Sequence, residues 1–149
     1  EMLERARDKA VYARLELGDV AENPFDGNAY DLAVTCLVDE HLPDLDGLYR
    51  EARRLLRPGG KFVQIGYHPH FLMLGIAAHF DRENGDSIGV ESHVHLTSDH
   101  VAAGHGAGFR LLEMIEGLVD EDWAELKPKW AKRYWGHPVT FAMVWELSG

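Results

Sequence analysis

The chain has 149 residues, 46% of them hydrophobic and 27% charged, which is the balance of one globular domain with a substantial core. Its formal net charge is −10, because 25 Asp and Glu outnumber 15 Lys and Arg. This charge repels phosphate backbones, and no cationic amphipathic segment is present, so we expect a small-molecule substrate and neither a nucleic-acid nor a membrane partner. The chain has no bilayer-length apolar run and no signal-peptide pattern, and Cys36 has no second cysteine to pair with. These features predict a cytoplasmic protein.

The first thirty residues predict a helix, a strand and a loop. Residues 2–9 place apolar side chains at helical spacing among charges. Residues 12–18 alternate apolar and polar side chains, as a half-buried strand does, and residues 21–29 collect the Asn, Pro, Asp and Gly of a loop. The chain begins inside a helical pattern without an N-cap, so we expect it to be a fragment of a longer chain or a version that starts late.

The next segment predicts a strand–helix–strand unit. Residues 30–38 are almost continuously apolar after Asp31, which is typical of a strand buried on both faces. Residues 44–57 carry apolar side chains on one helical face, with Asp44 as the expected cap, and the run Arg57-Pro58-Gly59-Gly60 ends the helix. Residues 61–67 form the following strand. Units of this kind build parallel sheets with right-handed crossovers.

The second half of the chain predicts a further set of alternating elements. In order, these are a short helix near 70–80, an extended piece before residue 96, a helix over 97–108, a strand over 109–119, a helix or lid over 120–135 and a last strand over 138–147. We expect residues 1–149 to form a single domain.

Three stretches, in this order and at this spacing, resemble class I S-adenosylmethionine-dependent methyltransferases. They are Leu15-Glu16-Leu17-Gly18-Asp19-Val20, the run from Tyr30 to Val38 followed by His41-Leu42, and Leu55-Leu56-Arg57-Pro58-Gly59-Gly60-Lys61-Phe62. The motif-bearing resemblance covers about residues 1–66. It implies a Rossmann-like α/β fold: a mostly parallel sheet with a C-terminal antiparallel strand and helices on both faces.

The resemblance also implies S-adenosylmethionine as the cofactor. In the family, an acidic residue at the position of Asp19 accepts a hydrogen bond from the adenine amino group, and the backbone amide at the position of Val20 meets the ring. The strand end at Thr35 and Cys36 lies beside the sulfonium. Two simpler roles stay open: Asp19 as a turn-forming residue, and Cys36 as a small buried apolar residue.

The sequence departs from the family in its cofactor loop. The Gly-x-Gly-x-Gly loop and the acidic residue that binds the ribose are both absent from the chain, and so are the first two family strands. Residues 1–9 correspond to the helix after the second strand. We therefore expect the strand at 12–18 to slide against residues 30–38, to pair with another copy, or to be disordered, because an unpaired strand edge is costly to bury. A homodimer that pairs exposed strand edges follows from this expectation.

The implied activity is methyl transfer to a small-molecule acceptor, by in-line displacement at the sulfonium methyl. His41 and His68 follow two strand ends and are the candidate general bases, because imidazole titrates near neutral pH. Residues 67–100 and 120–137 are the expected substrate-side segments. The alternative is a truncated, non-catalytic module that cannot bind cofactor alone, and a nicotinamide-dependent oxidoreductase fits the motifs poorly.

Two pairs of histidines raise the question of a metal site. His68 and His70 are two residues apart, and so are His93 and His95, so each pair would share one face of a strand. No Cys-x-x-Cys or His-Glu-x-x-His motif accompanies them. We predict no metal site.

Overall fold

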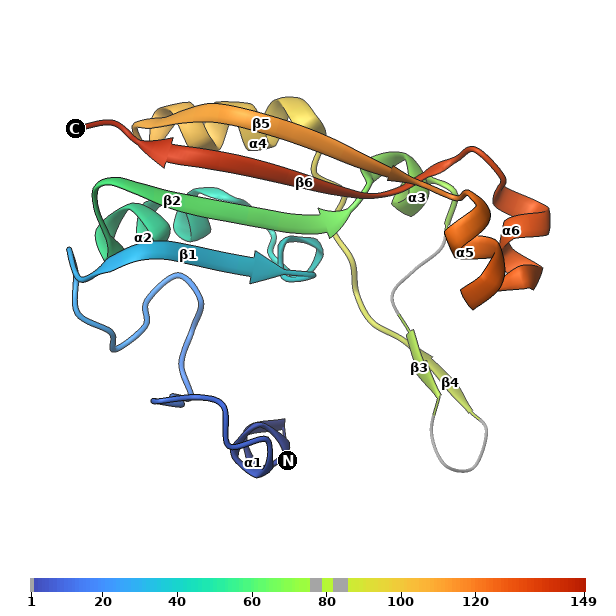
Figure 1. The fold of residues 1–149 in the computed structure, drawn as a ribbon, viewed down its shortest axis with the longest axis horizontal. Helices are drawn as coiled ribbons and strands as arrows, with labels where there is room; N and C mark the ends of the chain where they lie inside the picture. Colours follow the sequence, from blue (N-terminus) through green and yellow to red (C-terminus); the bar gives the residue numbers. More distant parts are fainter. Residues whose placement is uncertain (1, 76–78, 82–85) are drawn as a thin grey trace.

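The computed structural model describes residues 2–75, 79–81 and 86–149 (Figure 1). A four-stranded sheet in the order β1-β2-β6-β5 forms its centre, and β3 and β4 make a separate hairpin. The elements, in chain order, are α1 (Met2–Asp8), β1 (Tyr30–Cys36), the 3₁₀ turn η1 (Asp39–His41), α2 (Asp46–Leu55), β2 (Leu56–Tyr67), α3 (Pro69–Met73), β3 (His79–Asp81), β4 (Ser87–Gly89), α4 (Thr97–Gly106), β5 (Phe109–Leu118), α5 (Glu121–Leu126), α6 (Pro128–Tyr134) and β6 (Pro138–Leu147).

The directions of the strands confirm the predicted sheet. β1 and β2 pair in parallel, whereas β6 is antiparallel to β2 on one side and to β5 on the other. β5 therefore runs in the same direction as β1 and β2, and the C-terminal strand β6 is the one that runs against them. The sheet is mostly parallel in strand direction and has an antiparallel C-terminal strand, as expected.

The unit β1–α2–β2 forms where the sequence predicts it. The expected cap is wrong: Leu45 is the N-cap of α2 and makes no side-chain capping bond, while the carboxylate of Asp44 accepts a hydrogen bond from the backbone N–H of Asp46 (3.1 Å) in the turn before the helix. β2 begins at Leu56, earlier than expected. Tyr30 pairs with Leu56, but Leu32 pairs with Lys61, so the turn after α2 forms a bulge inside the strand. Gly59 in this turn has φ 78°, a conformation that glycine adopts without steric cost.

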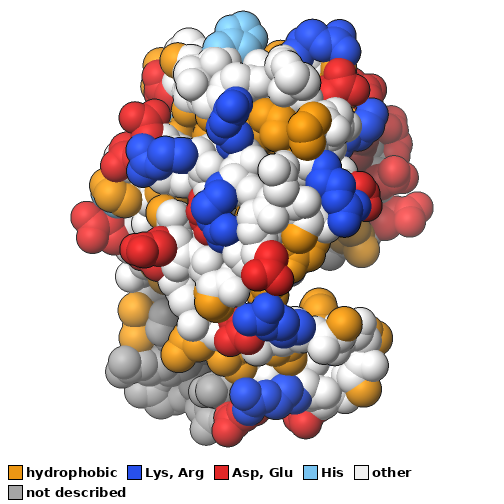
Figure 2. Space-filling model, turned by 90° about the vertical axis from the view of Figure 1, so that its left-hand side faces the viewer, with side chains coloured by type: hydrophobic (Ala, Val, Ile, Leu, Met, Phe, Trp, Pro, Cys, Tyr) orange, Lys and Arg blue, Asp and Glu red, His pale blue; other side chains and the backbone are white. Residues whose placement is uncertain are grey.

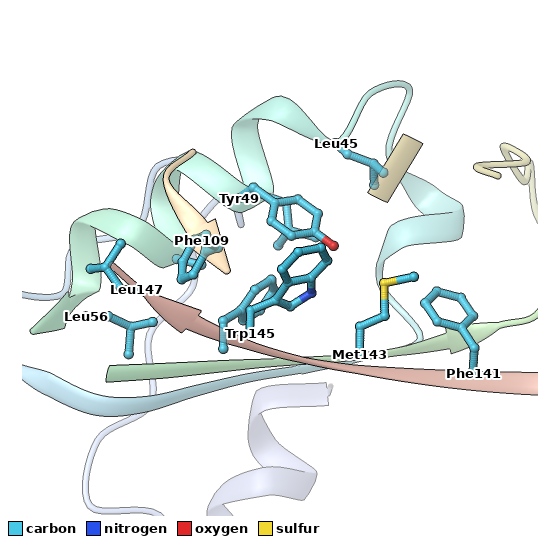
Figure 3. Close-up of a cluster of buried hydrophobic side chains, with 11 residues drawn as sticks. Leu45, Tyr49, Leu56, Phe109, Phe141, Met143, Trp145 and Leu147 are labelled. Carbon is cyan, nitrogen blue, oxygen red and sulfur yellow. The ribbon is translucent and has the colours of Figure 1, made fainter. Parts of the chain in front are cut away.

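One face of the sheet is closed by α2 and α4 over an aromatic core (Figure 3). Tyr49 of α2 is fully buried and meets Phe62 and Trp145 edge to face, at centroid distances of 5.3 and 5.6 Å. Gly104 lets α4 approach this core, because a Cβ there would lie 2.7 Å from the ring of Trp145. We call this the closed face.

The other face of the sheet, the open face, is largely exposed. Leu32 and Val34 of β1 are each 55% exposed, and Ile115 of β5 is 52% exposed. Helix α1 lies on this side of the sheet in Figure 3, but none of its residues is buried. The prediction that residues 30–38 are buried on both faces is therefore wrong. β1 is an edge strand, and only its closed-face side chains, such as Ala33, are covered.

The predicted strand over residues 12–18 does not form. This segment pairs with no strand in the described part of the chain, and an isolated bridge between Asp19 and Glu22 follows it. Tyr12 and Leu17 are exposed. The alternating pattern is present, but the segment does not lie against the free edge of β1, so the predicted sliding onto residues 30–38 is wrong. Pairing with another copy stays a prediction.

The predicted elements of the C-terminal half are confirmed with small shifts. α4, β5 and β6 lie within a few residues of expectation, and residues 120–135 form two short helices, α5 and α6. The helix expected near 70–80 is shorter, since α3 ends at Met73, and residues 76–78 of that prediction lie outside the described residues. A second small core joins α3, α5 and α6 around Phe71, with Trp123 and Trp130 stacked at 6.2 Å.

The described surface carries charges of both signs. Figure 2 shows Lys and Arg side chains interspersed with Asp and Glu on the end of the molecule that carries the C-terminus in Figure 1. Arg57 pairs with Asp31 (2.7 Å) and Arg110 with Glu146 (2.6 Å). Within the described ranges, no helix has both the length and the apolar character needed to cross a membrane.

Candidate cofactor and acceptor site

A cavity of about 380 Å³ lies between β1, α2 and the loop that precedes β1. Its walls are mainly apolar and include Val20, Ala33 and Leu48. Asp19, Thr35 and Glu51 are among the polar residues that line it. A concave, mostly apolar site with a few polar groups is the usual form of a small-molecule site. We call it the cofactor cavity, after the role that the sequence predicts for Asp19, Val20 and Thr35.

Asp19 is fixed at the edge of this cavity by a local turn. Its Oδ1 accepts a hydrogen bond from the backbone N–H of Ala21 (2.8 Å), and its carbonyl oxygen accepts one from Glu22 (3.2 Å). Both roles open to Asp19 are thus compatible, because the turn uses one carboxylate oxygen and Oδ2 has no protein partner among the described residues. Val20 is partly buried against the core beside it.

The strand end at Thr35 and Cys36 divides between the two faces. Thr35 lines the cavity, and its hydroxyl is hydrogen-bonded to Oε1 of Gln64. Cys36 points to the opposite face, as alternation along a strand requires, and it is exposed. The cavity therefore brings together Asp19, Val20 and Thr35, but not Cys36. The simpler interpretation of Cys36 as a buried apolar residue is wrong.

His41 and His68 follow the carboxyl ends of the neighbouring parallel strands β1 and β2, where open α/β sheets hold their ligands. The side chain of His41 is 42% exposed at the end of η1, and its Nε2 lies 3.8 Å from Oε1 of Glu40. The structure shows no hydrogen bond or ion pair between the two histidines within the ranges it describes.

His68 has protein partners at both ring nitrogens. Its Nδ1 accepts a hydrogen bond from the backbone N–H of His70 (3.1 Å), which makes His68 the cap of α3. Nδ1 must then be unprotonated in the neutral ring, so the proton sits on Nε2, which lies 2.8 Å from Oε1 of Glu116. His41 is the freer of the two rings.

A buried polar network beneath η1 was not predicted. Asp39 accepts a hydrogen bond from the Gln64 amide (2.7 Å), and its second oxygen lies 3.4 Å from Nε2 of His100. Nδ1 of His100 lies 3.1 Å from the Tyr49 hydroxyl. Glu40 is also buried, and its Oε2 has no hydrogen-bond partner among the residues that the structure describes. Burial raises the pKa of this carboxyl above the ordinary value of 4.5. The sequence does contain one indication of this network, because Gln64 is a polar residue between apolar residues of a strand.

The histidines do not assemble a metal site in the described residues. His70 stacks on His137 and shares a 3.0 Å contact with it, while His95 Nε2 contacts the carbonyl of Leu42 (2.8 Å). No group of three or more His, Cys, Asp and Glu with ligand geometry is found in the parts of the chain that the structure describes.

Comparison with known proteins shows what the chain is similar to. The methyltransferase-domain family model matches residues 1–64, close to the span of the motifs. An uncharacterized methyltransferase of Emericella nidulans is 29% identical over 117 residues, which are 74% of this chain and 41% of that protein. A sterol 24-C-methyltransferase of Aspergillus fumigatus is 32% identical over 112 residues, 69% of this chain and 28% of that protein. The chain thus spans less than half the length of these relatives.

A solved S-adenosylmethionine dependent methyltransferase from Mesorhizobium loti has the same fold, with a TM-score of 0.71 over 97% of this chain and 75% of that chain, at 19% sequence identity. The resemblance to class I S-adenosylmethionine-dependent methyltransferases is therefore confirmed. The cavity lined by Asp19, Val20 and Thr35 runs along β1 from Tyr30 to Thr35.

Proposed function

We propose that this methyltransferase-fold protein binds S-adenosylmethionine in the cofactor cavity and transfers its methyl group to a small-molecule acceptor in a cytoplasmic setting. The observation that carries the proposal is Asp19, held by its turn at the rim of an apolar cavity with one carboxylate oxygen available. Such an oxygen can accept a hydrogen bond from the amino group of adenine, while the apolar walls contact the ring.

The residues present fit the adenine half of the cofactor. Val20 and Ala33 offer apolar surface within the cavity, and Asp19 offers an acceptor at its edge. When bound, S-adenosylmethionine supplies an electrophilic methyl group on a sulfonium. The contribution of the protein is then to hold donor and acceptor in line, which is the main source of rate enhancement in such a transfer.

On the acceptor side we assign the proton-accepting role to His41. Its imidazole is partly exposed at the end of β1 and can take a proton from a hydroxyl or amine acceptor. His68, with both ring nitrogens engaged, is assigned to shaping the acceptor site through α3 and Glu116. Residues 67–100 and 120–137 supply the rest of that side in this proposal.

The test is isothermal titration of the protein with S-adenosylhomocysteine. We expect saturable binding, weakened about tenfold by Asp19→Ala, since a charge-assisted hydrogen bond contributes on that scale. Asp31→Ala is the matched control, because Asp31 is an exposed carboxylate paired with Arg57 outside the cavity. If the unaltered protein does not bind, the proposal fails, and the non-catalytic module becomes the better description.

A further inference from the structure

An ion pair on α2 joins Glu51, which lines the cofactor cavity, to Arg54, which does not line it. The guanidinium donates from Nε to Glu51 Oε2 and from an Nη to Oε1, each at 2.7 Å, in a two-pronged arrangement. The Glu51 side chain is only 8% exposed. The guanidinium holds the pKa of this carboxyl below its ordinary value of 4.5. The pair is therefore charged at neutral pH and mostly withdrawn from solvent on the carboxylate side.

Both partners also bind the backbone of the loop before β1. Glu51 Oε1 accepts a hydrogen bond from the N–H of Asn23 (3.0 Å). Arg54 donates to the carbonyl oxygen of Phe25 (2.8 Å) and to that of Asn23 (3.2 Å). A carboxylate that accepts from the loop and a guanidinium that donates to it together hold the loop by its main chain, and Arg54 also donates to the side-chain Oδ1 of Asn23 (3.4 Å). We call this pair the loop clamp.

The loop held by the clamp carries Asp19 and Val20, the two residues proposed to meet adenine. The clamp adds to the backbone hydrogen bonds that fix the two ends of the loop: the turn at Asp19, and the bonds from the N–H groups of Asn28 and Ala29 to the carbonyl oxygens of Arg54 and Leu55 (2.8 and 3.0 Å). α2 also approaches the loop closely at Gly47, where a Cβ would lie 2.8 Å from Cβ of Ala21. The helix thus holds the loop close to itself beside Asp19 and Val20, which line the cavity.

We propose that Glu51 and Arg54 are positioning residues for the cofactor: the loop clamp fixes the adenine-side wall of the cavity. This inference rests on the proposed function. Glu51 lines the cavity, but Arg54 does not, so the effect of Arg54 passes through Asn23 and Phe25 to the loop. Loss of the clamp lets the wall move. Asp19 can then accept its hydrogen bond from the ligand only if binding also orders the loop, which costs affinity.

The first experiment titrates S-adenosylhomocysteine and adenosine into the protein and into Arg54→Ala. We expect about a tenfold loss of affinity, similar for both ligands, since the clamp acts on the adenine side that they share. Arg57→Ala is the control, because Arg57 is a neighbouring arginine with an exposed partner, Asp31, outside the clamp. It should bind both ligands as the unaltered protein does.

A charge-exchanged variant, Glu51→Arg with Arg54→Glu, separates positioning from stability. It restores an ion pair on α2, so thermal stability should recover relative to Arg54→Ala. It also presents a cation to the N–H of Asn23 and an anion to the carbonyl of Phe25, so affinity should stay low. If affinity recovers with stability, or if Arg54→Ala binds normally, the clamp has no positioning role. If the unaltered protein binds neither ligand, the proposed function fails together with this inference.

Discussion

The closed and open faces of the sheet share the same four strands but differ in what covers them. On β6, Trp145 is fully buried under α2 and α4, whereas its neighbour Val144 points to the open face and is half-buried. On β1, Ala33 packs against the core, and Val34 is 55% exposed. Strand periodicity tells which side chains share a face, but the cover of that face comes from helices elsewhere in the sequence.

The largest expected effect comes from emptying the closed face. Trp145→Ala should lower the free energy of unfolding by about 3–5 kcal/mol, because it removes a large ring from a packed aromatic core. Val144→Ala on the open face should cost about 1 kcal/mol or less, since the site is already half-exposed. Urea unfolding of both variants measures the two values. Equal losses would show that the open face is covered in solution.

A smaller effect on the free energy of unfolding is expected from replacing Glu40, a buried residue of η1. Its pKa is raised by burial, so the folded state favours the protonated form. The stability this gives is fully present below the unfolded pKa, near 4.5, and is lost as pH rises through the higher folded pKa. Glu40→Gln cannot ionise and so avoids that loss. We expect its free energy of unfolding to exceed that of the unaltered protein by about 1 kcal/mol at neutral pH, and by little at pH 4. Thermal unfolding as a function of pH measures the difference. A gain that does not change with pH would contradict ionisation as the cause.

The smallest effect on folding is expected on the edge strand of the open face. Val34→Lys should change the free energy of unfolding by about 0.5 kcal/mol or less, because the side chain is exposed. We propose that two copies pair through the free edge of β1, and a lysine there disfavours such pairing. Analytical ultracentrifugation should therefore show weaker self-association of Val34→Lys. Unchanged association would rule out β1 as the contact.

The helices and strands of the sheet could be predicted because their patterns are local. The alternation of β6 and the Arg57-Pro58-Gly59-Gly60 turn are examples, and the turn also marks the family. The strand expected at 12–18 shows the opposite case, since alternation alone does not supply a partner. Asp19, Val20 and Thr35 could be placed by resemblance. The role of Glu51 and Arg54 could not be predicted from the sequence. Two charged residues on a helix usually lie on a solvated face, and the loop that they bind is known only from the structure.

The antiparallel strand β6 has a consequence for the order in which the molecule is made. It lies between β2 and β5, which are both earlier in the chain, so neither can complete its hydrogen bonds until residues 138–147 have been synthesised. During translation, β5 has no neighbouring strand to pair with before β6 is made. The apolar side chains of α2 and α4 also lack the part of the core that β6 supplies. Contacts between residues far apart in the sequence form slowly, and hydrophobic surface that is prone to aggregation stays exposed until they form. A chain that ends before Pro138 would thus lack β6. The edges of β2 and β5 that pair with β6 in the folded chain would then be unpaired.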